Sequence, residues 1–141
     1  MAAIERSATG TWQGDLKSGN GSMDAPSGVL AQTPFSFATR FENAKGTNPE
    51  ELIAAAHAAC FSMAFSNYLS QKGHVPQEIQ TKATISLEGG SLNKMHLETT
   101  GKVEGLDEAT FKQLADEAEK VCPVSNLLRP GLEISLDAKL A

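Results

Sequence analysis

Two cysteines have the strongest capacity for covalent chemistry in this 141-residue sequence. Cys60 lies deep within an apolar segment, and Cys122 directly precedes Pro123. An apolar environment raises the pKa of a thiol, and a mid-helix position lies far from the positive end of the helix dipole. Cys60 can therefore react only if a cation is brought to it from elsewhere. Otherwise it is a buried core residue, as free cysteines often are.

Arg40 is the candidate for that cation, because the other two arginines, Arg6 and Arg129, lie outside strongly patterned segments. A guanidinium stays charged when it is desolvated, so it can stabilise a thiolate and also donate to an oxygen. The alternative is an ordinary surface arginine. Glu50 is free to pair with an arginine, although a carboxylate at a helix start also complements the helix dipole.

Metal binding has little support in the sequence. His57 and Cys60 are three residues apart and share a helix face, but two ligands do not make a metal site. Cys60 and Cys122 are far apart and lack the C-x-x-C spacing of thioredoxin-like or zinc sites. We therefore expect no metal, and the role of Cys122 stays open between structure and chemistry.

A long helix must carry Cys60. Asn48 is a good N-cap, Pro49 suits the first helical position, and Glu51 completes a capping-box pattern. The apolar stretch Leu52–Phe65 is shorter than the ~20 residues of a membrane span, and Gly73 supplies a stop signal. Because this helix is apolar nearly all round, we expect it to be buried on every side.

Short strands separated by turns are expected in the first forty residues, and the period-two pattern of Phe35–Phe41 predicts a strand. Arg40 would lie on the face of that strand opposite its aromatic residues. The later elements are expected at Gln80–Leu87 (strand), Gly89-Gly90 (hairpin turn), Leu92–Val103 (strand), Asp107–Val121 (helix), Val124–Leu128 (turn) and Leu132–Leu140 (strand). This order predicts one α+β domain, residues 1–141, with an antiparallel or mixed sheet.

The charge balance argues against two classes of partner. Twelve Lys and Arg against seventeen Asp and Glu leave a net charge of −5, which disfavours nucleic acid and anionic membranes. The first residues, Met1–Arg6, do not resemble a secretory signal. We therefore expect a cytoplasmic protein whose two thiols are kept reduced.

Three separated motifs resemble the OsmC/Ohr family, and specifically its OsmC branch. They are Phe37–Phe41, then Lys45–Leu52 followed by Ala56–Met63, and finally Cys122–Ser125. The resemblance covers nearly the whole chain. It implies an intertwined α+β homodimer with a long central helix and active sites at the subunit interface. It also implies a thiol-dependent peroxidase that acts on organic hydroperoxides in oxidative or osmotic stress defence.

The resemblance assigns roles to four residues. Cys60 is the peroxidatic thiol, Cys122 the resolving thiol, Arg40 the activating cation and Glu50 its carboxylate partner. Peroxide would convert Cys60 to a sulfenic acid, and Cys122 would then close a disulfide. An external dithiol, of lipoyl type or carried by a lipoylated protein, would reopen it, so no bound cofactor is expected.

Helix geometry adds a prediction about the dimer. Glu50 and Cys60 are ten residues apart, which is about 15 Å along a straight helix. Glu50 is therefore expected to serve Cys60 of the partner subunit, with the two long helices antiparallel. Phe61, Met63 and Phe65 are candidates for an apolar lining that favours alkyl or lipid hydroperoxides over hydrogen peroxide. The alternatives are a non-enzymatic protein that binds apolar ligands and a redox-sensing dimer.

Overall fold

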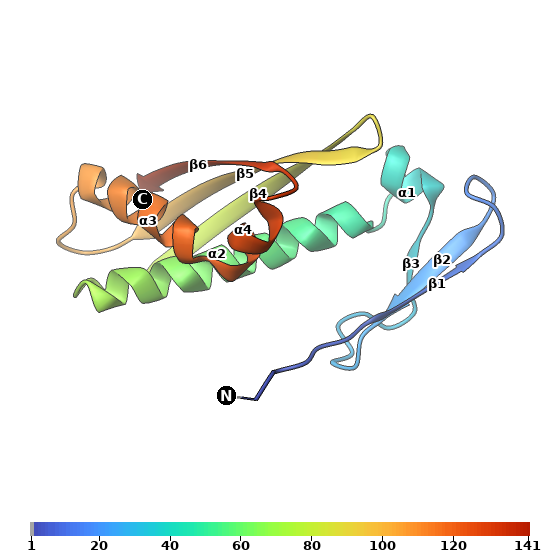
Figure 1. The fold of residues 1–141 in the computed structure, drawn as a ribbon, viewed down its shortest axis with the longest axis horizontal. Coiled ribbons are helices and arrows are strands. Elements are labelled where there is room, and N and C mark those ends of the chain that lie inside the picture. Colours follow the sequence, from blue (N-terminus) through green and yellow to red (C-terminus); the bar gives the residue numbers. More distant parts are fainter. Residues whose placement is uncertain (1) are drawn as a thin grey trace. The chain divides into compact units, whose positions relative to one another are not determined.

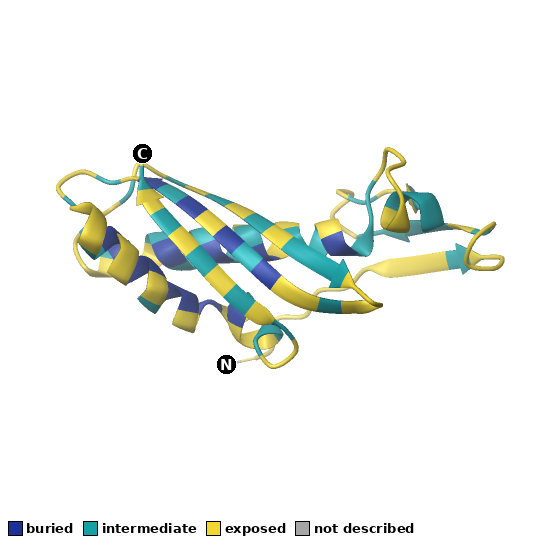
Figure 2. Ribbon diagram, turned by 90° about the horizontal axis from the view of Figure 1, so that it is seen from above, coloured by how far each residue is buried: buried dark blue, intermediate teal, exposed yellow. Residues whose placement is uncertain are grey.

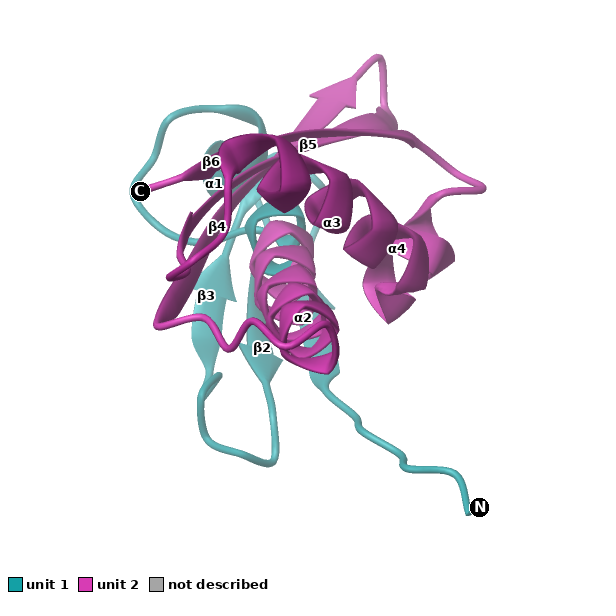
Figure 3. Ribbon diagram, turned by 90° about the vertical axis from the view of Figure 1, so that its left-hand side faces the viewer, with its two compact units in different colours: residues 1–52 teal, residues 53–141 magenta. Residues whose placement is uncertain are grey.

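The computed structural model describes residues 2–141, and the chain forms two compact units, residues 1–52 and residues 53–141 (Figure 3). The first unit holds β1 (Thr9–Gln13), β2 (Asn20–Asp24), β3 (Thr33–Phe35) and α1 (Phe37–Phe41). The helix α2 (Pro49–Gln71) crosses the boundary between the units. The second unit continues with β4 (Glu78–Glu88), β5 (Ser91–Lys102), α3 (Glu108–Val121), α4 (Pro123–Leu128) and β6 (Glu133–Leu140) (Figure 1).

The sheet of the first unit is antiparallel in the order β1-β2-β3. Gly21 in the central strand pairs with Trp12 on one side and Phe35 on the other. The two rings meet over this glycine, with centroids 5.5 Å apart. A Cβ on Gly21 would lie 2.6 Å from the Phe35 ring and 2.7 Å from the Trp12 ring. The glycine is therefore what allows the rings to pack together directly before α1 begins.

The strand predicted for Phe35–Phe41 is wrong beyond Phe35, because Phe37–Phe41 forms α1. Ser36 caps this helix. Its Oγ accepts from the backbone N–H of Thr39 at 3.2 Å, and the Thr39 hydroxyl oxygen accepts from the Ser36 N–H at 2.9 Å. Aromatic residues at positions 37 and 41 fit both periods, since residues four apart share a helix face as well as a strand face. The reciprocal cap decides in favour of the helix.

The start of α2 was predicted correctly. The Asn48 side-chain oxygen accepts from the N–H of Glu51 at 2.8 Å, as an N-cap does. The Glu51 carboxylate does not complete the expected box in this structure; it accepts from the Thr47 hydroxyl at 2.6 Å. The Asn48 amide also donates to the carbonyl of Thr39 at 2.9 Å. This second bond ties the last turn of α1 to the first turn of α2.

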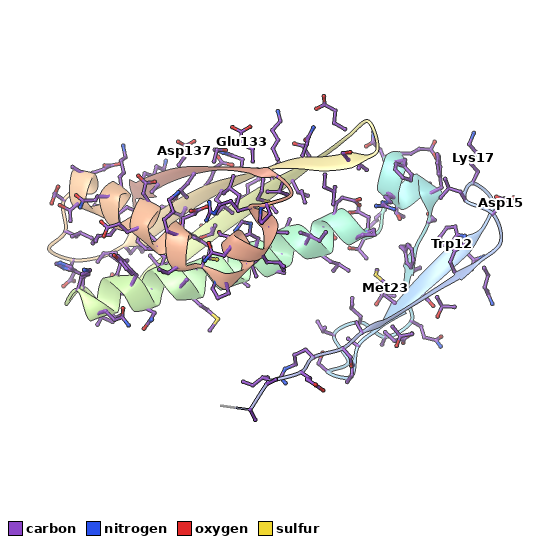
Figure 4. All side chains as sticks on the ribbon, in the orientation of Figure 1. Trp12, Asp15, Lys17, Met23, Glu133 and Asp137 are labelled. Atoms are coloured by element: carbon purple, nitrogen blue, oxygen red, sulfur yellow. The ribbon has the colours of Figure 1, made fainter. Side chains whose placement is uncertain are left out.

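The second unit contains a mixed sheet in the order β4-β5-β6, with β4 and β5 antiparallel and β5 and β6 parallel. Gly89 and Gly90 turn the β4-β5 hairpin with φ angles of 58° and 80°, as the sequence predicted. The helices α2 and α3 lie on one face of this sheet (Figures 1 and 3). Glu133 and Asp137 of β6 project from its other face (Figure 4).

The core of the second unit fills the space between its sheet and helices. Phe61 and Phe65 of α2, Phe111 of α3, and Met95 and Leu97 of β5 are fully buried there. Along β5 the buried residues alternate with exposed or half-buried ones (Figure 2). The predicted helix over residues 107–121 is present, with Asp107 as its N-cap. The turn predicted for Val124–Leu128 is instead the short helix α4.

Only one side of α2 is buried within the chain. Residues four apart, namely His57, Phe61, Phe65 and Leu69, have no exposed surface. On the other side Ala55, Ala56 and Ala59 are exposed, and Met63 is 76% exposed. The helix is long and apolar enough to span a membrane by length and composition alone, a property that core helices share. Burial on every side is therefore not achieved by the single chain.

Candidate active site

Cys60 and Cys122 meet in the second unit although they are 62 positions apart. The Cys122 thiol donates to the Cys60 sulfur at an S···S distance of 3.6 Å. Both are free thiols; Cys122 is fully buried, whereas Cys60 is half-buried. Two thiols at this distance need only a small approach, to about 2.0 Å, to form a disulfide.

The position of Cys122 follows from the proline after it. Pro123 disfavours helical backbone at Cys122, which is extended with φ −72° and ψ 117°. Cys122 therefore ends α3 and, as the N-cap, also begins α4, where Pro123 occupies the favoured first position. The resulting corner directs the Cys122 sulfur toward Cys60 of α2.

The electrostatics of Cys60 within the second unit disfavour the thiolate. Burial raises the pKa of the Cys60 thiol, and a hydrogen bond from the backbone N–H of Val124 lowers it in part. The neighbouring Cys122 also raises the pKa of Cys60. The net direction is upward, so Cys60 needs a nearby positive charge to become a nucleophile at neutral pH.

A groove of about 840 Å³ in the second unit gives access to Cys60. Its apolar lining comes from α2 and from the junction of α3 and α4: Ala56, Ala59, Met63, Ala64, Val121 and Pro123. Tyr68, Asn67 and Gln71 add polar groups farther along α2. Met63 therefore lies where a ligand could contact it. Phe61 and Phe65 do not, because both are fully buried in the core in this structure.

Arg40 and Glu50 form an ion pair in the first unit. Nε of Arg40 donates to Oε1 of Glu50 at 2.9 Å, and Nη2 of Arg40 lies 2.8 Å from the same oxygen. Arg40 projects from α1 rather than from a strand, and its guanidinium carbon lies 5.2 Å from the centre of the Phe41 ring. The expectation that Arg40 points away from the aromatic residues is therefore wrong.

The surroundings of this ion pair are apolar. Glu50 in the first turn of α2 is only 8% exposed, and its Oε2 has no hydrogen-bond partner in the described part of the chain. Arg40 borders a pocket of about 430 Å³ that is lined by Trp12, Phe35, Phe37 and Phe41. The four residues singled out from the sequence thus form two defined pairs, one in each unit.

Sequence reasoning missed a second contact beside the cysteines. His57 is fully buried, and its Nε2 lies 2.7 Å from the hydroxyl of Ser125, which is also fully buried. Burial lowers the pKa of His57, an effect that the Glu119 carboxylate partly offsets. The i, i+3 spacing of His57 and Cys60 was visible in the sequence, but nothing local indicated Ser125 as the partner. Among residues 2–141 no group of three potential metal ligands was found.

Arg129 also has a defined role. Its Nη1 and Nη2 donate to the two oxygens of the Glu119 carboxylate at 2.8 and 3.0 Å. Glu119 lies in the last turns of α3 and is 5% exposed, while Arg129 caps the end of α4. This two-point ion pair spans the corner at Cys122.

Comparison with known proteins agrees with the motifs. Residues 42–137 match the family model of OsmC-like proteins. The chain is 46% identical to peroxiredoxin OsmC of Escherichia coli, with 97% of each chain covered. It is 36% identical to an organic hydroperoxide resistance protein of Xanthomonas axonopodis, over 64% of this chain and 66% of that protein.

A solved structure shares the fold. An organic hydroperoxide resistance protein from Elizabethkingia anophelis aligns over all of both chains with a TM-score of 0.74 at 24% identity. The resemblance that the sequence motifs indicated is confirmed, and the chain belongs to the OsmC-like protein family.

Proposed function

We propose that this protein is a cysteine-based peroxidase that reduces organic hydroperoxides to alcohols, with Cys60 as the attacking thiol and Cys122 as the resolving thiol. The observation that carries the proposal is the 3.6 Å approach of the buried Cys122 sulfur to Cys60, which lines an apolar groove. The relatives are named a peroxiredoxin and organic hydroperoxide resistance proteins, which supports the same activity.

The reaction balances with these two thiols. The Cys60 thiolate attacks the distal peroxide oxygen, the O–O bond breaks, and the leaving alkoxide takes a proton to become the alcohol. Cys60 is then a sulfenic acid. The Cys122 thiol attacks the Cys60 sulfur, and the hydroxyl leaves as water when the disulfide forms. An external dithiol reduces the disulfide by two thiol exchanges and becomes oxidised itself.

Activation of Cys60 requires a cation, and Arg40 is the residue that we assign to this role. The guanidinium would favour the thiolate and stabilise the negative charge that develops on the departing oxygen. Glu50 would fix the direction of the guanidinium through the ion pair described above. The upward pKa shift of Cys60 within its own unit supports the need for such a partner.

A homodimer would supply this cation. The helix α2 is continuous from Pro49 to Gln71, so Glu50 and Cys60 are separated by about 15 Å along its axis. An antiparallel pair of α2 helices would bring Arg40 and Glu50 of one copy to Cys60 of the partner subunit. The exposed side of α2 supports this arrangement, because its small alanine side chains allow helices to approach closely and Met63 adds apolar surface.

The apolar surroundings of both pairs favour an alkyl or lipid hydroperoxide over hydrogen peroxide. We further propose a lipoyl-type dithiol or a lipoylated protein as the reductant. A cytoplasmic location and a role in oxidative or osmotic stress defence complete the proposal, and the net charge of −5 gives no support to nucleic-acid or membrane binding.

Rapid mixing with cumene hydroperoxide tests this function. Cys60 should be oxidised quickly, and the Cys122 thiol should then be lost as the disulfide forms; oxidation should be slower with hydrogen peroxide and absent in the Cys60→Ser variant. A Cys122→Ser variant should still react but should form no disulfide within the chain, and with one equivalent of hydroperoxide it should stop at the sulfenic acid. Slow and equal loss of both thiols would contradict the peroxidase. Fast oxidation without turnover under any dithiol would instead indicate a redox sensor.

A further inference from the structure

Two contacts join α2 to the segment that carries Cys122, and they have the same spacing. On α2, His57 lies three residues before Cys60; on the other segment, Ser125 lies three residues after Cys122. His57 contacts Ser125 at 2.7 Å, and Cys60 contacts Cys122 at 3.6 Å. The two pairs are thus neighbouring cross-links between the same two segments, which run in opposite directions. The position of one pair constrains the other.

The His57–Ser125 contact is kept at an energetic cost. His57 Nδ1 is buried and has no hydrogen-bond partner in the described part of the chain. If Nε2 donates to the Ser125 oxygen, the lone pair of Nδ1 is left unsatisfied; if Nε2 accepts, the N–H at Nδ1 is left unsatisfied. A buried polar atom without a partner is destabilising, and an apolar side chain would avoid the cost. The presence of a histidine at position 57 is therefore better explained by the hydrogen bond between its Nε2 and Ser125.

The far end of the same segment is held separately. Arg129 at the end of α4 contacts both carboxylate oxygens of Glu119, and the Asn126 amide donates to the carbonyl of Lys120 at 3.0 Å. These bonds tie α4 to α3. The His57–Ser125 hydrogen bond is instead a link from α4 to α2, the helix that carries Cys60. Together with the hydrogen bond from the Val124 backbone N–H to Cys60, it fixes the distance between the two sulfurs, and it is the link between side chains that a substitution can remove.

We propose that His57 and Ser125 are positioning residues that hold Cys122 against Cys60, so that the disulfide closes before a second peroxide molecule reaches the sulfenic acid. This inference rests on the proposed peroxidase function. Two reactions compete for the sulfenic acid. The Cys122 thiol displaces its hydroxyl as water and forms the disulfide, whereas a second hydroperoxide transfers an oxygen, giving the sulfinic acid and an alcohol. If α4 moves away from α2, disulfide closure by Cys122 slows, whereas the reaction with a second hydroperoxide does not.

Two substitutions remove the contact, and one preserves it. Ser125→Ala deletes the hydroxyl, and His57→Met replaces the imidazole with an apolar side chain of similar length. His57→Gln places an amide close to the position of Nε2 and can keep the hydrogen bond. Ser62→Ala is the matched control. It removes a partly buried hydroxyl from the same helix, which donates to the Thr81 hydroxyl at 2.8 Å. It does not remove any contact between α2 and α4.

The experiment follows oxidation by cumene hydroperoxide in rapid mixing, with intact mass used to count sulfenic, disulfide and sulfinic forms. The initial oxidation of Cys60 should stay within about twofold of the parent protein in all four variants. Disulfide closure should slow at least about tenfold in Ser125→Ala and His57→Met, with a matching rise in sulfinic acid. His57→Gln should restore closure, and Ser62→Ala should close like the parent protein.

The outcomes separate the two proposals. A parent protein whose Cys60 does not react with the hydroperoxide would overturn the peroxidase function itself. A parent protein that reacts, together with unchanged closure in Ser125→Ala and His57→Met, would overturn the positioning role alone. Equal slowing in Ser62→Ala would also overturn it, because general loosening of α2 would then explain the effect. Thermal unfolding of each variant shows whether the compared proteins are folded.

Discussion

Two nitrogens of the Arg40 guanidinium approach one carboxylate oxygen of Glu50: Nε donates to Oε1 at 2.9 Å, and Nη2 lies 2.8 Å from the same atom. The carboxylate belongs to the first turn of a long helix, and the guanidinium belongs to the short helix before it. Because Glu50 is nearly buried, its ion pair with Arg40 is less screened by water than a surface pair would be. Glu50 therefore fixes the plane of the guanidinium.

Replacement of Arg40 by lysine should show that this geometry matters beyond charge. Arg40→Lys keeps the positive charge but loses the planar group whose Nε and Nη2 both contact Glu50. The rate constant for Cys60 oxidation by cumene hydroperoxide should fall about 100-fold, as misplacement of a catalytic group by about 1 Å can cause. Arg6→Lys makes the same change on an exposed residue and should have no effect. An unchanged rate in Arg40→Lys would show that the positive charge alone is sufficient and that the orientation of the guanidinium does not matter.

The pH dependence of thiol alkylation should reveal the cation at Cys60. Only the thiolate reacts with iodoacetamide, so the rate rises as the pH increases through the pKa of the thiol. Burial raises the pKa of Cys60 within its own unit. In a Cys122→Ser background, Arg40→Met should therefore move the midpoint of the rate profile to higher pH. Identical midpoints with and without Arg40 would show that the guanidinium does not act on Cys60.

The elements that the sequence predicted correctly each have a local signal that allows only one structure. The N-cap at Asn48, the turn at Gly89-Gly90 and the end of α3 before Pro123 each depend on residues close in sequence. The segment Phe37–Phe41 failed because its aromatic spacing satisfies both a strand and a helix. Only the contacts between Ser36 and Thr39 decide between them.

The contacts within the candidate site were harder to predict, because they join residues that are far apart in the sequence. The pairing of Cys60 with Cys122 joins positions 62 apart, and it was expected only because of the family resemblance. The contact between His57 and Ser125 spans 68 positions and follows from how α4 packs against α2. No periodic pattern or short motif encodes such a distance. Long-range partners of single polar residues therefore required the structure.

The buried imidazole of His57 should make the free energy of unfolding decrease as the pH falls. Burial lowers the pKa of His57 below the 6.5 of a free histidine; Glu119 opposes this shift and Arg129 reinforces it. As pH falls below 6.5, the unfolded chain binds a proton that the folded chain does not, so the free energy of unfolding decreases. Urea unfolding between pH 7.5 and about pH 5 should show this loss, and His57→Gln should reduce it. A pH dependence unaltered by His57→Gln would assign the loss to other groups.

Mixing two inactive variants gives the sharpest test of the proposed dimer. If Arg40 of one copy serves Cys60 of the partner subunit, a mixed dimer of Arg40→Met and Cys60→Ser contains one site with both native residues. Random exchange makes about half of the dimers mixed, so activity should recover to about a quarter of that of the parent protein. A mixture of Arg40→Met with Arg40→Met,Cys60→Ser should recover nothing, because neither copy supplies the guanidinium. If Arg40 serves the cysteine of its own chain, the first mixture stays inactive too, because no copy then has both native residues. Recovery in the first mixture alone therefore identifies a site shared between two copies.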